Sequence, residues 1–163
     1  NMQRAAFYAG RAFTRGCVGY VHAIGHAVGG LYGVPHGKAM AILLPHVLKA
    51  FGSSAEAKLA ELADHCGLSA EYGVDHDDRT GGCACPAYGA MKGKTTNNGK
   101  ARLFIEWIEN TKRSMDIPDR FDCIKEEDVE TIAKWADAEA NPLYPVPKIF
   151  DRKQLEDLVR SVM

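Results

Sequence analysis

The sequence predicts an all-α fold, and three observations support this prediction. Apolar residues recur at helical spacing through most of the chain. No segment of convincing length alternates apolar and polar residues, as a half-buried strand would. Glycine, proline and serine separate the periodic segments at points where helices commonly begin and end. The 163 residues suit about one domain, and they contain no internal repeat.

The first three predicted helices are separated by glycine-containing breaks. Residues 3–15 form an amphipathic helix that Gly16 ends. A second helix is expected from about residue 18 to residue 32, with a small, apolar face that lets neighbours approach closely. The third, at residues 36–51, is apolar on all sides and should be buried. Pro45 lies inside it and is expected to kink it.

A fourth helix is predicted at residues 55–66, and Gly67 closes it. Ser53 or Ser54 is expected to provide the N-terminal cap, because a serine hydroxyl accepts from the first free backbone amides. The helical spacing places three apolar side chains of this helix toward the core: Leu59, Leu62 and Ala63.

The second half of the chain has a long irregular segment and three more helices. Residues 72–100 are rich in turn-forming residues and show little periodicity. Helical spacing resumes at residue 101 and ends at Ile117. The acidic residues 125–128 resemble the first turn of another helix. Proline holds residues 141–147 extended, and Asp151 is expected to cap the last helix.

Composition excludes several classes of function. The formal net charge of −1 leaves no basic surface for nucleic acid or an anionic membrane. No apolar run reaches the roughly 18 residues of a membrane span, and no signal peptide is visible. Five cysteines without a disulfide spacing favour a reduced, cytoplasmic setting. Five side chains are expected in the core: Cys17, Cys66, Cys123, Trp107 and Trp135.

The histidines carry the clearest chemical signal. His22 and His26 are four residues apart, so they project from the same helical face. His36 follows a Gly-Val-Pro break, and an antiparallel hairpin would bring it back toward them. This pattern predicts a two- or three-histidine metal site between helices. No Asp or Glu lies between residues 15 and 51, so the ligand set is unfinished there. His46 and His65 are interpreted as hydrogen-bonded packing residues.

Three segments of the sequence resemble a known family. The segment GYVHAIGHAVGGLYGVPHGKAMAILLPHVL is similar to the signature of the iron-dependent (group III) alcohol dehydrogenases, which share a dehydroquinate synthase-like fold. The N-terminal AAFYAGRAFTRG and the tail ANPLYPVPKIFDRKQLEDLV resemble the family too, so the similarity covers about residues 3–70 and 101–162. The resemblance implies that residues 1–163 form part of the helical metal-binding domain, with the N-terminal dinucleotide-binding domain absent.

The resemblance also implies roles for the histidines. His22 and His36 match two of the family's metal ligands, for Fe(II) or in some relatives Zn(II). The other ligands, an Asp and a His, belong to an upstream D-x3-H helix that this sequence lacks. His26 matches a catalytic position beside the nicotinamide, implicated in the proton relay. The metal polarises the alcohol or carbonyl oxygen and NAD(P) exchanges the hydride.

The implied activity is interconversion of a small alcohol with an aldehyde or ketone. The chain alone is expected to be inactive, and its uncovered apolar faces favour a homo-oligomer. An alternative is a non-catalytic helical interaction module from a truncated or split gene. Residues 73–100 resemble an insertion without a family counterpart. Cys83 and Cys85 in it are more simply free thiols of a solvated loop than zinc ligands, because C-x-C with a distant His is no standard zinc pattern. Met40 replaces an Asn common in the family.

Overall fold

A computed structural model describes residues 1–68 and 96–163 of the chain. Every regular element within these two ranges is a helix, so the predicted all-α class is confirmed. In chain order these are α1 (Met2–Gly16), α2 (Tyr20–Tyr32), α3 (His36–Phe51), α4 (Ser53–His65), α5 (Asn97–Ser114), the short 3-10 helix η2 (Glu126–Asp128), α6 (Val129–Ala140) and α7 (Arg152–Ser161). None of the helices described is long and apolar enough to cross a membrane.

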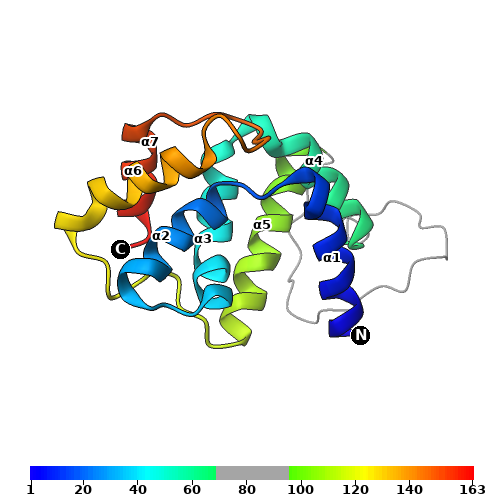
Figure 1. Ribbon diagram of the computed structural model, residues 1–163. Helices are drawn as coiled ribbons and strands as arrows, with labels where there is room; N and C mark the ends of the chain where they lie inside the picture. Colours follow the sequence, from blue (N-terminus) through cyan, green and yellow to red (C-terminus); the bar gives the residue numbers. More distant parts are fainter. Residues whose placement is uncertain (69–95) are drawn as a thin grey trace.

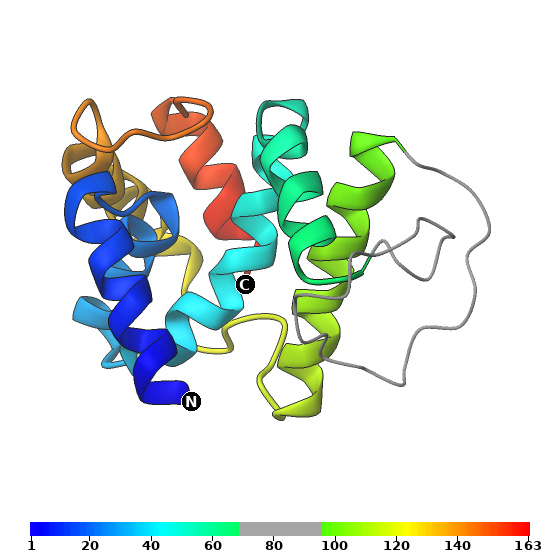
Figure 2. The ribbon, with the colours of Figure 1, turned by 90° about the vertical axis from the view of Figure 1, so that its right-hand side faces the viewer.

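Helix α3 lies at the centre of the fold (Figures 1 and 2). It contacts α2 and α7 on one side and α4 and α5 on the other. Its apolar side chains explain this position, because Ile42, Leu43 and Val47 are fully buried. Pro45 is also buried, and the helix continues past it to Phe51. The predicted bounds of this helix are confirmed.

Helices α4 and α5 pack side by side at one end of the molecule (Figure 2). Helix α5 begins at Asn97, four residues before the predicted start, because the Thr96 hydroxyl accepts a hydrogen bond from the Gly99 backbone N–H. Residues 97–100 are therefore helical, whereas the sequence predicted them to be irregular. The serine cap predicted for α4 is also wrong, since the residue before its first turn is Gly52 and no side chain caps it.

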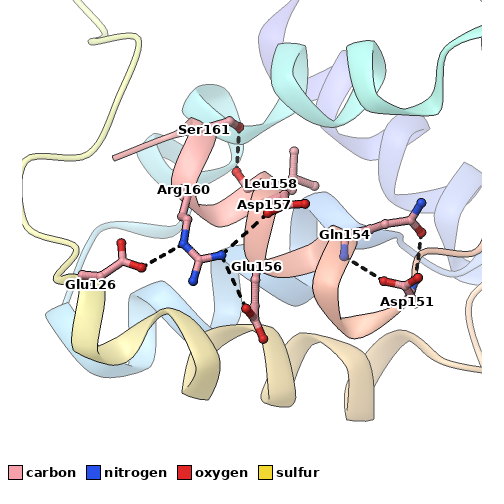
Figure 3. A network of polar contacts seen from close by, with 8 residues as sticks. All are labelled: Glu126, Asp151, Gln154, Glu156, Asp157, Leu158, Arg160 and Ser161. Atoms are coloured by element: carbon pink, nitrogen blue, oxygen red, sulfur yellow. Dashed lines mark hydrogen bonds and ion pairs between the residues drawn. The ribbon is translucent and has the colours of Figure 1, made fainter.

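The other end of the molecule is built from α2, α6 and α7 (Figure 1). Asp151 caps α7 as predicted, through a capping box in which its carboxylate accepts from the Gln154 N–H and the Gln154 side chain accepts from the Asp151 N–H (Figure 3). Farther along α7, the Arg160 guanidinium donates to Glu126 of η2 at 2.8 Å (Figure 3).

A buried tyrosine fixes the segment 141–150 to α2. Residues 141–143 form a turn, closed by a hydrogen bond from the Tyr144 N–H to the Ala140 carbonyl, so the extended conformation predicted there is wrong. Tyr20 is fully buried, and its hydroxyl donates to Asn141 Oδ1 at 2.7 Å. The Tyr20 hydroxyl oxygen also accepts from the Phe150 backbone N–H at 2.9 Å. The ring centroids of Tyr20 and Phe150 also lie 4.9 Å apart. This segment is therefore held at both ends against the helix that carries His22 and His26.

A partly buried ion pair ties α5 to the loop that follows it. The Lys112 side chain is only 3% exposed, and its ammonium lies 2.7 Å from Asp119 Oδ1. The approach is too oblique for a well-aligned hydrogen bond, so the contact is an ion pair. His46 of α3 lies beside this loop, 3.1 Å from the Asp119 carbonyl oxygen. The packing role predicted for His46 is confirmed.

Several predicted core positions are wrong. Trp135 is 46% exposed and Leu62 is 44% exposed, because each lies on a helix face that no described helix covers. Cys17, Cys123 and His65 are exposed, while Cys66 and Trp107 are half-buried. Cys83 and Cys85 lie outside the described residues, as does most of the segment interpreted as an insertion.

Helix α1 differs from the others because none of its residues is buried. Met2, Phe7, Tyr8 and Phe13 are all at least half exposed. Three arginines occupy one stripe of the helix, at positions 4, 11 and 15. Among the described residues, an aromatic contact outside the helix joins Phe13 to His22, whose ring centroids are 6.5 Å apart.

Candidate functional site

The hairpin of α2 and α3 brings the three histidines together, as their spacing predicts. Gly33 ends α2 in a left-handed conformation with φ 67, and its backbone N–H donates to the Gly29 carbonyl. The chain then reverses, and His36 opens α3. Ring centroids lie 5.3 Å apart for His22 and His36, 5.4 Å for His26 and His36, and 5.7 Å for His22 and His26. The three imidazoles thus form a triangle on the hairpin of α2 and α3.

A close approach of the two helices supports this arrangement. Gly25 precedes His26 and is buried. A Cβ at this position would lie 2.0 Å from Met40 Cε of α3, so only glycine leaves room for the Met40 side chain as it stands. Met40, the residue that departs from the family pattern, therefore packs against α2 at the residue next to His26.

The three imidazoles differ in their surroundings. His22 is half-buried, whereas His26 and His36 are exposed. Burial lowers the pKa of His22, the positive charges of His36 and His26 lower it further, and the Glu139 carboxylate opposes them. A lowered pKa favours neutral imidazole, which is the form that binds a metal ion.

Sequence reasoning missed a carboxylate that meets the triangle from α6. Glu139 Oε1 lies 2.8 Å from His26 Nδ1 and accepts a 2.9 Å hydrogen bond from the Tyr144 hydroxyl. Burial raises the pKa of Tyr144, and the hydrogen bond to Glu139 raises it further. Glu139 is 113 residues from His26 in the chain, which hid the pairing. One sequence signal for Glu139 was available, because it directly precedes the family-like tail that begins at residue 140.

His22 also lines an apolar pocket. Its volume is about 330 Å³, and its walls include Phe13 of α1, Val47 of α3 and Val146 of the segment 141–150. Cys17 also lines it, in a left-handed conformation with φ 55 that is uncommon for residues other than glycine. The pocket can receive a small apolar group next to an imidazole.

The donor set fits part of a metal site. A metal–nitrogen bond of about 2.1 Å places each ring centroid roughly 3.2 Å from the ion, so two imidazoles at a tetrahedral angle stand about 5 Å apart. The 5.3 Å separation of His22 and His36 agrees with this spacing. Imidazole suits both Fe(II) and Zn(II). Among the described residues, no group of three or more His, Cys, Asp or Glu side chains is arranged to hold a metal ion.

Comparisons with known proteins agree with this geometry. The family model described as "Fe-containing alcohol dehydrogenase family, C-terminal" matches residues 1–163. "Alcohol dehydrogenase 4" of Schizosaccharomyces pombe is 49% identical over 81 residues, covering 46% of this chain. "1,3-propanediol dehydrogenase" of Citrobacter freundii is 46% identical over 67 residues, covering 41% of this chain.

A solved structure shows the same fold. A 1,3-propanediol oxidoreductase superposes on 95% of this chain with a TM-score of 0.73 and 27% identity. The chain covers 35% of that structure, and the aligned regions cover 19% and 17% of the two sequence relatives. The chain therefore spans well under half the length of the proteins it matches, and it matches their C-terminal part.

Proposed function

Because the chain belongs to the Fe-containing alcohol dehydrogenase family, we propose that it forms the metal-binding helical part of a dehydrogenase. The reaction is interconversion of an alcohol with an aldehyde or ketone, with hydride transfer to or from NAD(P). The observation that carries this proposal is the triangle of imidazoles at 5.3–5.7 Å spacing, formed by residues 22, 26 and 36.

Each histidine has a separate role in the proposal. His22 and His36 hold the metal ion, Fe(II) or Zn(II), because they match the ligand positions that the family resemblance implies. Their 5.3 Å ring separation and the lowered pKa of His22 are compatible with that role. Such an ion, when bound, supplies Lewis-acid chemistry at an alcohol or carbonyl oxygen. His26 is the general acid–base that moves the hydroxyl proton, and its 44% exposed side chain has a route to solvent.

The apolar pocket next to His22 completes the chain's share of the site. It orients the aliphatic part of a small alcohol, since its walls combine Phe13, Val47 and Val146. Its volume of about 330 Å³ suits a substrate of a few carbon atoms. The proposal assigns nucleotide binding and the remaining metal ligands to the part of the family's proteins that precedes the matched region.

A chimera tests the proposal. Residues 1–163 replace the corresponding C-terminal segment of the Citrobacter freundii 1,3-propanediol dehydrogenase, and the product is assayed for bound iron and for NADH oxidation with small aldehydes. His22→Ala and His36→Ala are expected to lose stoichiometric iron and activity together. His26→Ala is expected to keep iron but lose about 10²-fold or more in kcat, the usual contribution of a general acid–base.

The matched control is His65→Ala, an exposed histidine of α4 that should change neither readout. Retention of stoichiometric iron by both His22→Ala and His36→Ala would refute the ligand assignment. An unimpaired kcat in His26→Ala would refute the proton-transfer role. An iron-loaded chimera without any turnover would favour the non-catalytic alternative.

A further inference from the structure

We infer that Glu139, itself held by Tyr144, is a positioning residue that fixes His26 as the tautomer with its proton on Nδ1. Nε2 is then left with a free lone pair for proton transfer. The inference deepens the proposed function, because it concerns the residue to which that function assigns proton transfer. It also describes a property of the folded chain that exists without metal or nucleotide.

The geometry places one carboxylate oxygen between two ring-bearing side chains. Glu139 Oε1 lies 2.8 Å from His26 Nδ1 and 2.9 Å from the Tyr144 hydroxyl oxygen. Glu139 is on α6, His26 is on α2, and these helices pack against each other. Tyr144 belongs to the segment 141–150, which Tyr20 fixes to α2. Both partners of the carboxylate, His26 and Tyr144, are therefore held by the same helix.

Hydrogen-bonding capacity selects one tautomer. An ionised carboxylate has no proton to donate, so a hydrogen bond between Glu139 and a neutral His26 requires the proton on Nδ1. The Nε2–H tautomer would instead place the Nδ1 lone pair 2.8 Å from a carboxylate oxygen, which is repulsive. Histidine in water favours Nε2–H, so the site must reverse an intrinsic preference. A carboxylate that orients an imidazole through Nδ1–H and leaves Nε2 to the chemistry is an established arrangement.

The Tyr144 hydroxyl holds the Glu139 carboxylate in place. A carboxylate that rotates away from His26 loses the hydrogen bond that Oε1 accepts from Tyr144. The Glu139 side chain is 32% exposed and that of His26 is 44% exposed, so water competes for both. A second anchor therefore matters more here than it would in a dry core.

Nitrogen NMR of the full chain tests the inference directly. The chain is labelled with ¹⁵N-histidine, freed of metal with a chelator and studied at about pH 8.5, above the usual histidine pKa of about 6.5. Long-range ¹H–¹⁵N correlations report which ring nitrogen carries the proton, and the signals that vanish in His26→Gln assign the residue. The expected result for the unaltered chain is a predominance of Nδ1–H at His26.

Three variants separate positioning from simple packing. Glu139→Leu should lower the Nδ1–H to Nε2–H ratio about tenfold, as loss of a half-exposed, charge-assisted hydrogen bond implies. Glu139→Gln should also lower the ratio, because its amide can present either the oxygen or the NH₂ to the ring and the Tyr144 hydroxyl can donate to the one or accept from the other. Tyr144→Phe should lower the ratio by a smaller factor than Glu139→Leu, because the carboxylate remains an acceptor but loses the hydrogen bond that holds it toward His26.

Glu130→Leu, an exposed site on the same helix, is the matched control and should leave the ratio unchanged. Predominant Nε2–H at His26 in the unaltered chain would overturn the inference. So would an unchanged ratio both in Glu139→Leu and in Glu139→Gln. If Glu139→Leu does not fold, Glu139→Gln, which keeps the shape of the side chain, still decides. None of these results depends on iron or turnover, so failure of the proposed function is a separate outcome.

Discussion

Tyr20→Phe is the substitution whose cost follows most directly from the structure. It removes one oxygen atom from a side chain that is fully buried, and the ring that packs 4.9 Å from Phe150 stays in place. That oxygen donates to Asn141 Oδ1 at 2.7 Å and accepts from the Phe150 N–H at 2.9 Å. The change therefore deletes two hydrogen bonds and little else.

The two partners lose different amounts. The Phe150 N–H is left without a partner in a residue that is 3% exposed, which costs about 1–3 kcal/mol. Asn141 is only part-buried and its amide stays held by hydrogen bonds from Nδ2, so water reaches its oxygen in place and its loss is about 0.5–1 kcal/mol. The expected total is about 1.5–4 kcal/mol, equivalent to a drop in Tm of roughly 3–16 °C for a chain of this size.

Urea denaturation followed by far-ultraviolet circular dichroism measures this change. The midpoint should fall while the slope m stays constant, because the surface exposed on unfolding is unchanged. Tyr8→Phe on α1, where the side chain is 58% exposed, is the matched control and should stay within about 0.5 kcal/mol of the parent. Amide exchange in residues 141–150 should accelerate in Tyr20→Phe alone. A stability loss below about 0.5 kcal/mol would show that this hydroxyl does not hold the segment.

Two further predictions concern stability. Asp151→Ala removes the capping box of α7 and should lower the free energy of unfolding by about 1 kcal/mol in thermal or urea unfolding. The control, Lys153→Ala in the same turn, should lower it little. Equal effects of the two substitutions would contradict the capping role. The Lys112 ammonium lowers the pKa of Asp119, so this pair contributes its full stability above the unfolded carboxyl pKa of about 3.9 and loses it as pH falls through the lower folded value. Asp119→Asn should therefore destabilise the chain by about 1–2 kcal/mol at pH 7, a value already reduced for the 52% exposure of Asp119. The destabilisation should become progressively smaller below about pH 4. A stability difference between variant and parent that does not change with pH would refute the assignment.

Local sequence rules located most of the helices. Glycine and proline breaks bound α2 and α3, and the bounds of α3 agree with the prediction to the residue. The capping pattern at Asp151 was also legible, because a capping box involves only neighbouring residues. The start of α5 was missed for a related reason. Thr96 caps a first turn of Asn97 to Lys100, whose polar residues carry no periodic signal.

Exposure was harder to predict than helicity. An apolar spacing shows which side of a helix is apolar, but it does not show whether another element covers that side. Leu62 and Trp135 satisfy the helical spacing and remain 44% and 46% exposed. All of α1 follows the same pattern, since its periodicity is clear and none of its residues is buried.

The site divides in the same way. The sequence alone determined that His22, His26 and His36 converge, because a fixed spacing on one helix and a short break before the next are local constraints. Only the tertiary structure revealed Glu139 and Tyr144 beside His26, since packing α6 against α2 joins residues more than a hundred positions apart. Helical geometry is encoded over a few neighbouring residues, whereas a contact between distant helices depends on how the whole core packs.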